Sequence, residues 1–561
     1  MLRAAPALAL VLLAGPVLFG LTATVLPAFG FLPALGGDYF GLEEFRRVFG
    51  EPGILRSCLL SLIVGLATTA VSLALVAGFL ASWSHTRAFG FFAHLLSPLL
   101  SVPHAAAAFG LAFLVAPSGW LLRLVSPEWT GFERPPDWLI IHDPMGLSLM
   151  LGLIAKEMPF LFLVALAALP QARPEANLRV AASLGYGRFA AFTHTVWPRV
   201  YPQIRLAVFA VIAYSSSVVD VAIILGPTQP ATLAVRLVEW MSDADLARRL
   251  EASAGAILQL GVSALAILIW IACERLLAKL LGKLRCSGRR FRRDRIIRFA
   301  MAGLVGVSAV SVFGGLAVLC LWSFADLWPF PDAIPHELSL RNWQRQLPQI
   351  ERPFWNTLAV GVAATGIAIV LALACLEREV RVGRTGGARA LMVLYLPLII
   401  PQAAFVFGLQ LFFLFAGVGA HPAALVLAHL VFVLPYVFLS LSDPWRAFDP
   451  RFAAVAASLG ATPDRIFWRV RLPMVLRPAL VAAAVGFAVS VGQYLPTLLI
   501  GAGRWPTLTT EAVALASGGD RRLIGVYALL QLLLPLFGFL MATLIPAVLF
   551  SNRREMRTSA A

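Results

Sequence analysis

Residues 181–185 read Ala-Ala-Ser-Leu-Gly, and the same five residues return at 456–460. A proline follows the glycine of each copy at the same interval, as Pro198 and as Pro473. Both copies lie in polar, basic segments that separate long apolar ones. A polar segment repeated in this way indicates that the chain contains one unit twice. It also indicates that each unit touches the same kind of soluble partner.

The composition is that of a membrane protein. Of the 561 residues, 60% are hydrophobic and 13% are charged, and the mean hydropathy is +0.83. A soluble fold of this size could not bury so much apolar surface. A helix of about 20 apolar residues crosses about 30 Å of hydrocarbon. We therefore predict an all-α polytopic membrane protein with about 12 transmembrane helices, near 6–27, 57–81, 91–116, 147–169, 204–225, 253–273, 299–323, 355–376, 391–416, 423–441, 479–500 and 523–549.

The two halves of the chain align beyond the repeated pentapeptide. Residues 103–110 (PHAAAAFG) match residues 401–408 (PQAAFVFG). The proline that begins each stretch could break a helix, although proline is also tolerated in ordinary spanning helices. The offset between the halves changes because a long outer loop near 117–145 corresponds to a very short one near 417–421.

This alignment also decides how the first apolar segment is interpreted. The segment could be a cleaved signal peptide, but it has a counterpart at 299–323, so we expect it to be retained. The sequence then predicts two homologous six-helix permease units, residues 1–274 and 299–561. A basic cytoplasmic linker at 275–298 joins them.

The formal net charge of +16 would suit a nucleic-acid binder, but its distribution indicates membrane orientation instead. With the amino terminus inside, Lys and Arg concentrate in the termini and the even-numbered connections, whereas the outer loops carry a small acidic excess. Basic residues are retained on the cytoplasmic side of membranes. We therefore predict a multi-pass inner-membrane protein with both termini cytoplasmic and no nucleic-acid partner. The linker is expected to lie on anionic membrane lipid.

Each repeated segment is predicted to form a short helix, a bend and a second short helix. Ala181, Ala182 and Leu184 favour helix, and Gly185 permits a sharp bend. Pro198 stands where a following helix can begin without losing a needed donor. The second segment repeats the pattern with its own glycine and proline.

The two segments resemble the cytoplasmic loop of the permease subunits of binding-protein-dependent ABC importers. That loop reads E-A-A-x-x-x-G, followed at a fixed interval by I-x-L-P. Residues 179–185 are RVAASLG and residues 454–460 are AVAASLG, and the interval from glycine to proline fits in both. Both copies depart from the family at the glutamate, and Trp197 replaces the leucine in the first copy. The resemblance covers nearly the whole chain, and the fused arrangement is similar to the ferric-iron and thiamine permeases and their relatives.

The resemblance implies a transport subunit that does not itself hydrolyse ATP. In that family the loop docks in a cleft of an ATPase subunit, and closure of two such subunits switches the halves between inward-open and outward-open states. No Gly-x-x-x-x-Gly-Lys-Ser/Thr motif occurs here, so the ATPase is expected on a separate chain.

The implied partners are two ATP-binding-cassette ATPase subunits, a periplasmic solute-binding protein and lipid. The implied solute is small and polar or charged, with ferric iron or thiamine favoured by similarity alone. The implied coupling loops span 174–200 and 449–477, with coupling residues Arg179, Ala181, Ala182, Ser183, Leu184, Gly185, Pro198, Ala454, Ala456, Ala457, Ser458, Leu459, Gly460, Leu472 and Pro473.

A few polar residues fall inside the predicted spans. Asp220 lies late in the fifth span, and Lys156 and Glu157 lie within the fourth. Charges in a membrane are costly, so they usually face a cavity or a partner. Gln493 and Tyr494 lie at the corresponding depth in the second half. These five residues are candidates for the translocation path; the alternative is that Lys156 pairs with a carboxylate only to hold helices together.

Two other functions compete with this interpretation. A secondary active transporter driven by an ion gradient can also be built from two six-span halves. It would need ion-coupling acids, for which Glu157 and Asp220 are the candidates. A membrane enzyme would need clustered His, Cys or carboxylate side chains, which the sequence does not suggest. Neither the five cysteines nor the eight histidines have ligand spacing, so no metal or cofactor is expected.

Overall fold

The computed structural model describes residues 2–33, 36–84, 86–419 and 421–551, and these are overwhelmingly helical. In this part of the chain the one small sheet pairs β1 (Phe31–Leu32) with β2 (Gly37–Asp38). The prediction of an all-α polytopic membrane protein is therefore confirmed. The long apolar helices are α1 (Ala5–Ala28), α3 (Ile54–Trp83), α7 (Leu147–Ala168), α13 (Arg248–Cys286), α14 (Arg295–Phe324), α15 (Arg341–Val382), α18 (Pro422–Arg446) and α25 (Arg521–Leu549).

Among the described residues, nine helices are long and apolar enough to cross a membrane, namely these eight and His104–Arg123, or up to eleven if each of two bent pairs counts as one span. The predicted segment 204–225 is not among them. It is divided between α10 (Trp197–Ser217) and α11 (Asp220–Leu225). The first half of α10 also carries Arg199 and Arg205, which lower its hydropathy.

Two spans in each half are broken, at matching positions. In the third predicted span, α4 (Arg87–Leu96) and η2 (Ser97–Ser101) precede α5 (His104–Val115). In the ninth, α16 (Ala388–Ile399) bends by 87° into α17 (Gln402–Phe415). Pro103 and Pro401 stand just before the second helix of each pair, where a residue without an N–H cannot continue the preceding helix. The break between α10 and α11 recurs between α22 (Leu476–Val491) and α23 (Leu495–Gly501).

The two halves pack together through glycine contacts, in which the first long helix of each half crosses a helix of the other half. Helix α1 packs on α17 of the other half, where Gly408 lies directly against the carbonyl oxygen of Gly20. The amide of Gly408 also donates to Thr24 Oγ1 at 3.1 Å. Helix α14 packs on α5 in the same way, and a Cβ added to Gly315 would lie 2.6 Å from the carbonyl carbon of Gly110. Small residues allow such close approach of membrane helices. Gly110 and Gly408 are the final residues of the matched stretches PHAAAAFG and PQAAFVFG.

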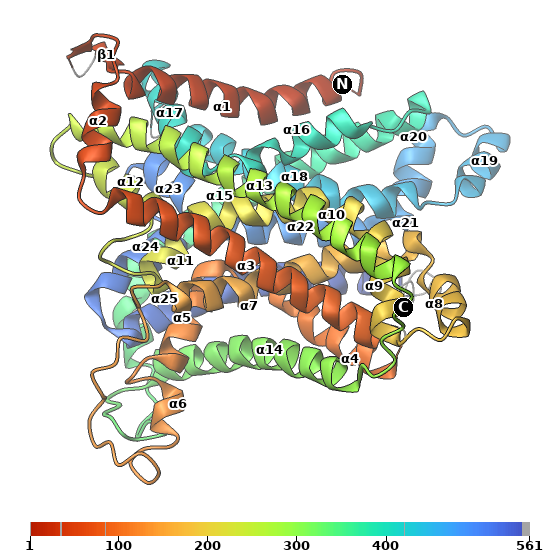
Figure 1. Ribbon diagram of the computed structural model, residues 1–561. Helices are drawn as coiled ribbons and strands as arrows, with labels where there is room; N and C mark the ends of the chain where they lie inside the picture. Colours follow the sequence, from red (N-terminus) through yellow and green to blue (C-terminus); the bar gives the residue numbers. More distant parts are fainter. Residues whose placement is uncertain (1, 34–35, 85, 420, 552–561) are drawn as a thin grey trace.

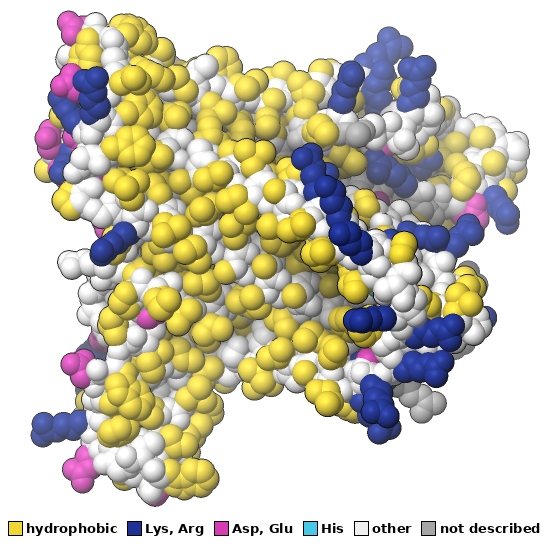
Figure 2. All heavy atoms as spheres, viewed as in Figure 1, with side chains coloured by type: hydrophobic (Ala, Val, Ile, Leu, Met, Phe, Trp, Pro, Cys, Tyr) yellow, Lys and Arg dark blue, Asp and Glu magenta, His cyan; other side chains and the backbone are white. Residues whose placement is uncertain are grey.

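Short helices gather at two opposite ends of the bundle (Figure 1). At one end lie α8 (Pro174–Ser183), α9 (Arg188–Thr195), α19 (Pro450–Ser458) and α20 (Pro463–Ile466), together with the amino-terminal end of α1. At the other lie α2 (Glu43–Gly50), α6 (Trp120–Arg123), α12 (Leu233–Met241) and α24 (Leu508–Leu515). Figure 2 shows a broad apolar band between the ends, with Lys and Arg side chains gathered at the end that carries α8 and α19. The other end shows side chains of both signs.

Candidate functional site

The first repeated segment ends α8 with a glycine-dependent helix stop. Gly185 has a φ of +83°, a left-handed conformation that glycine adopts without steric cost. The amide of Gly185 donates to Ala182 O at 2.9 Å, and the amide of Tyr186 donates to Ala181 O at 3.1 Å. This pair of bonds is the Schellman motif, which satisfies the last carbonyls of a helix. Helix α9 follows, and α10 begins at Trp197 with Pro198 in its first turn.

The second repeated segment has the same helix stop. Gly460 has a φ of +79°. Its amide donates to Ala457 O at 2.9 Å, and the amide of Ala461 donates to Ala456 O at 3.0 Å. Helix α20 follows, then a π-helical turn, η4 (Phe467–Arg471), and α21 (Leu472–Met474), which contains Pro473. The repeated pentapeptide therefore encodes one local structure twice.

Both short helices present apolar side chains to solvent at the same end of the bundle. Val180 and Leu184 are 63% and 55% exposed, and Val455 and Leu459 are 60% and 83% exposed. The residues that replace the family glutamate do not disturb this face. In the first segment, Arg179 forms an exposed ion pair with Glu175 on its own helix, and in the second the exposed Ala454 takes the same place.

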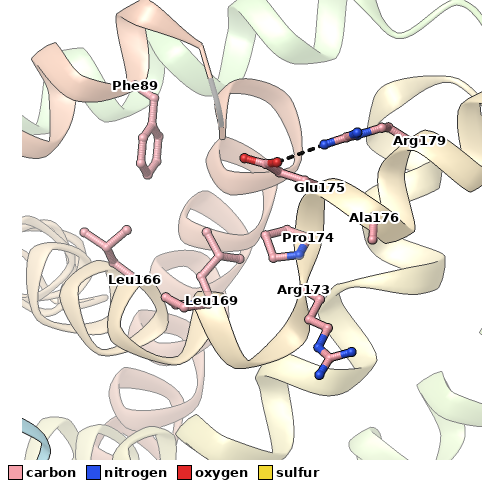
Figure 3. A pocket seen from close by; sticks show the side chains of 9 residues that line it. Phe89, Leu166, Leu169, Arg173, Pro174, Glu175, Ala176 and Arg179 are labelled. Atoms are coloured by element: carbon pink, nitrogen blue, oxygen red, sulfur yellow. Dashed lines mark hydrogen bonds and ion pairs between the residues drawn. The ribbon is translucent and has the colours of Figure 1, made fainter. Parts of the chain in front are cut away.

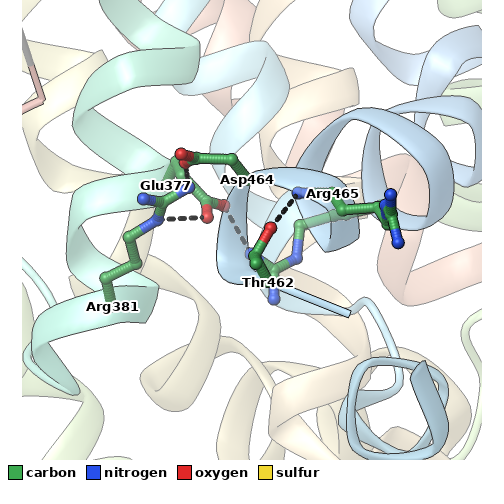
Figure 4. Close-up of polar contacts among 6 residues, drawn as sticks. Glu377, Arg381, Thr462, Asp464 and Arg465 are labelled. Carbon is green, nitrogen blue, oxygen red and sulfur yellow. Dashed lines mark hydrogen bonds and ion pairs between the residues drawn. The ribbon is translucent and has the colours of Figure 1, made fainter. Parts of the chain in front are cut away.

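Ion pairs from α15 fasten the second segment to the bundle (Figure 4). Arg381 donates from Nε to Glu377 Oε1 and from Nη2 to Asp464 Oδ1, both at 2.8 Å. Arg471 pairs with the other oxygen of Glu377, and its guanidinium carbon lies 5.1 Å from the ring centre of Phe448. Glu377 and Arg471 are both buried. The carboxylate of Glu377 thus joins the end of α15 to the last turn of the second segment.

The first segment stands beside an open pocket at the same end of the molecule (Figure 3). The pocket has a volume of about 640 Å³ and lies between α8 and the ends of α4 and α7. Phe89, Leu166 and Leu169 form its apolar wall, and the ion pair of Glu175 with Arg179 lies on its α8 side. The two repeated segments thus have the same local structure but different surroundings.

Lys156 supports a broken helix. Its Nζ donates to the carbonyl oxygens of Leu99 and Val102, at 2.6 and 2.5 Å. Both carbonyls lie at the break between η2 and α5, where Leu99 O receives only a long bond of 3.4 Å from the amide of Val102. Neighbouring side chains commonly satisfy such groups inside membranes. The buried ammonium of Lys156 is therefore used to stabilise the break.

Glu157 and Asp220 lie in a polar cluster at the contact between the halves. His104 Nε2 is 3.1 Å from Glu157 Oε1, and the His104 ring centre is 4.9 Å from that of Tyr214. Asp220, at the start of α11, is 7% exposed and lies within electrostatic reach of His104 and of Tyr494 from the second half. The structure thus brings Glu157, Asp220 and Tyr494 together around two residues that the sequence did not single out.

The fifth candidate, Gln493, lies beside this cluster. Its Oε1 is 3.5 Å from Nε2 of Gln402, the counterpart of His104 in the matched stretches. The same position after the broken helix thus bears a polar side chain in both halves. That repeated polar position is the sequence signal that could have found His104. No comparable signal marks Glu377, because its partner Arg471 is distant in the sequence.

Comparison with known proteins identifies the family to which this architecture belongs. Residues 364–551 match the family of binding-protein-dependent transport system inner membrane components. The chain is 33% identical over 507 residues to the inner membrane ABC transporter permease protein YnjC of Escherichia coli strain K12, and the alignment covers 90% of each chain. It is 26% identical to the putative 2-aminoethylphosphonate transport system permease protein PhnV of Salmonella typhimurium, over 39% of this chain and 84% of the relative. It is 32% identical to the molybdenum transport system permease protein ModB of Mycobacterium tuberculosis, over 20% and 47%.

A duplicated bundle of membrane helices with two matching loops at one end is the architecture of a transport permease. The chain belongs to the permease subunits of ABC importers. It is a multi-pass inner-membrane transport subunit, and the family as a whole works with ATPase and solute-binding partners. The predicted importer permease is confirmed, and the comparisons do not support the secondary transporter.

Proposed function

We propose that the two repeated segments are coupling loops, each receiving one ATP-binding-cassette ATPase subunit. The observation that carries this proposal is the repeated helix stop, which presents Val180 with Leu184 and Val455 with Leu459 at one end of the bundle. One chain then binds two ATPase subunits and one periplasmic solute-binding protein. ATP hydrolysis takes place on the ATPase subunits. The mass of the purified complex tests this stoichiometry.

The same arrangement supports one orientation in the membrane. We propose that the end bearing α8 and α19 is cytoplasmic, as are both termini, which agrees with the basic side chains gathered there (Figure 2). Residues 1–274 and 299–561 then act as two six-span permease units joined by the linker 275–298. The solute is small and polar or charged. The names of the relatives mention molybdenum and 2-aminoethylphosphonate, so molybdate and 2-aminoethylphosphonate are the first solutes to test. Ferric iron and thiamine follow only from the resemblance of the fused arrangement.

Gly460→Val should abolish receptor-stimulated ATP hydrolysis while the protein remains inserted and folded. A side chain at a φ of +79° costs about 1–2 kcal/mol, and nothing lies within 4 Å of an added Cβ, so the strain stays local. The measurement is ATP hydrolysis by the reconstituted permease with its ATPase subunit and receptor. Gly519→Val is the matched control, since Gly519 has a φ of +73° and open space but lies outside both loops. Equal hydrolysis in both variants would remove the second loop from coupling.

We propose further that Asp220, Glu157, Gln493 and Tyr494 line the translocation path, and that Lys156 supports it. Asp220→Asn should change the rate of uptake into proteoliposomes at least about tenfold, an effect of about 1.4 kcal/mol, with little change in yield. Labelled molybdate and 2-aminoethylphosphonate are the probes, and Asp220→Glu is the charge-preserving control. A loss of protein yield with normal uptake per molecule would instead assign Asp220 to helix packing.

A further inference from the structure

The end of the linker lies on the first coupling loop. The residues concerned, 288–294, are called the linker strap. The amide of Gly187 donates to Arg290 O at 3.0 Å, and Arg292 Nε donates to Gly185 O at 3.3 Å. The amide of Phe189 donates to Asp294 Oδ2 at 2.9 Å, so this carboxylate satisfies an N-terminal amide of α9. The first 12 residues of the linker, 275–286, continue α13.

The absence of a side chain at Gly187 allows the close contact between the linker strap and the first loop. Its φ of −62° suits any residue, so backbone conformation does not require glycine here. An added Cβ would instead overlap the carbonyl oxygen of Phe291 in the linker strap. In the second loop the matching position is Thr462, whose Oγ1 accepts from the amide of Arg465 at 3.3 Å and caps α20. The second loop therefore caps itself, whereas the first takes its cap from the linker.

The linker strap also gives the first loop a basic border. Arg289, Arg290 and Arg293 are exposed, and they lie in the segment that contacts Gly185, next to the exposed Leu184. Burial and the neighbouring Arg285 lower the pKa of His194 in α9. In the second loop, nothing lies within 4 Å of a Cβ added to Gly460.

We propose that the linker strap is a permanent part of the first docking surface. The ATPase subunit bound there contacts strap arginines through acidic side chains, whereas the other subunit contacts the second loop without a strap. This inference rests on the proposed function, since it assumes that ATPase subunits dock on both loops. The two ATPase positions are then unequal in affinity and in salt dependence, because charged rim contacts respond to ionic strength.

Limited trypsin digestion tests the strap contact without any partner. The native contact should slow cleavage after Arg289–Arg293, because a protease needs the segment to open first. Gly187→Ala should raise the rate of cleavage between the halves about tenfold or more. Gly282→Ala is the matched control, since nothing lies within 4 Å of its added Cβ. Equal cleavage rates in Gly187→Ala and the wild-type protein would overturn the proposal.

Charge reversal tests the docking role. Arg289→Glu with Arg293→Glu should weaken binding of one of two copies of the cognate ATPase subunit about tenfold or more. Lys279→Glu with Lys283→Glu makes the same change of charge on α13 and should leave both affinities unchanged in nanodiscs of neutral lipid.

An equal effect of the two pairs of substitutions, or no effect of the first pair, would overturn the proposal. If the linker only binds anionic lipid, both variants will differ from the wild-type protein solely in anionic nanodiscs. Failure of the wild-type protein to bind any ATPase subunit would refute the docking role and the proposed function together, while the trypsin result would still stand.

Discussion

We expect Gly408→Leu to abolish the accumulation of folded protein. A side chain at this position would overlap the carbonyl oxygen of Gly20, which belongs to the backbone of α1 and cannot rotate away. Overpacking against movable side chains already costs about 1–3 kcal/mol, so a collision between two backbones should cost more. The amide bond to Thr24 would be lost as α17 moved away from α1. Size-exclusion chromatography of the detergent-extracted protein measures the folded fraction.

Gly366→Leu is the control for this experiment. Gly366 also lies in a membrane helix, α15, but nothing lies within 4 Å of its added Cβ. It should therefore accumulate like the wild-type protein. Gly110→Leu should behave like Gly408→Leu, because Gly110 makes the equivalent crossing with α14. A normal folded fraction for Gly408→Leu would show that α1 and α17 do not meet as closely as described.

The second large effect is expected from Glu377→Ala, which should destabilise the protein by about 3–5 kcal/mol. The change leaves Arg471 buried without its carboxylate. When one partner of a buried ion pair is removed, the desolvation penalty of the remaining charge is no longer compensated. The second coupling loop should then be held to α15 only by the pair of Arg381 with Asp464, so receptor-stimulated ATP hydrolysis should fall together with stability. Thermal unfolding of the purified protein and ATP hydrolysis of the reconstituted complex are the two measurements.

Two further variants separate the buried pair from a general effect of charge. Arg179→Ala breaks the exposed pair with Glu175 and should change stability by about 0–1 kcal/mol. The double change Glu377→Leu with Arg471→Met removes both charges and should recover most of the lost stability. A cost for Glu377→Ala no larger than that for Arg179→Ala would show that the buried pair does not hold the second loop.

The sequence predicted the membrane fold because helix length and apolar composition follow from the thickness of a bilayer. It also predicted the helix, bend and helix of each loop, since a glycine such as Gly460 marks a helix end by its own conformational freedom. The number of spans was harder to predict. The breaks before His104 and before Asp220 depend on neighbours that satisfy free backbone groups, and Lys156 does this from another helix.

The candidate path was predicted only in part, for a related reason. A charge inside an apolar segment signals that it needs a partner, but it does not identify that partner. Asp220 and Glu157 were visible as charges, whereas the histidine beside them looked like one residue in an alanine-rich stretch. The contact of the linker with the first loop could not be predicted, because the charged residues of the linker suggested a different partner. Ten basic residues suggested a lipid contact, and the carbonyl of Phe291 that requires Gly187 carries no sequence signal at all.

The crossed glycine contacts constrain how the protein is made. Helix α1 leaves the ribosome long before its partner α17, which begins only at Gln402. At about 5–20 residues per second, the interval between the two is about 20–75 seconds. During that time the surface around Gly20 in α1 lacks the partner helix that covers it in the folded protein. Two separate genes would leave this face waiting for a second product, whereas a single reading frame delivers both partners to one insertion site in equal number.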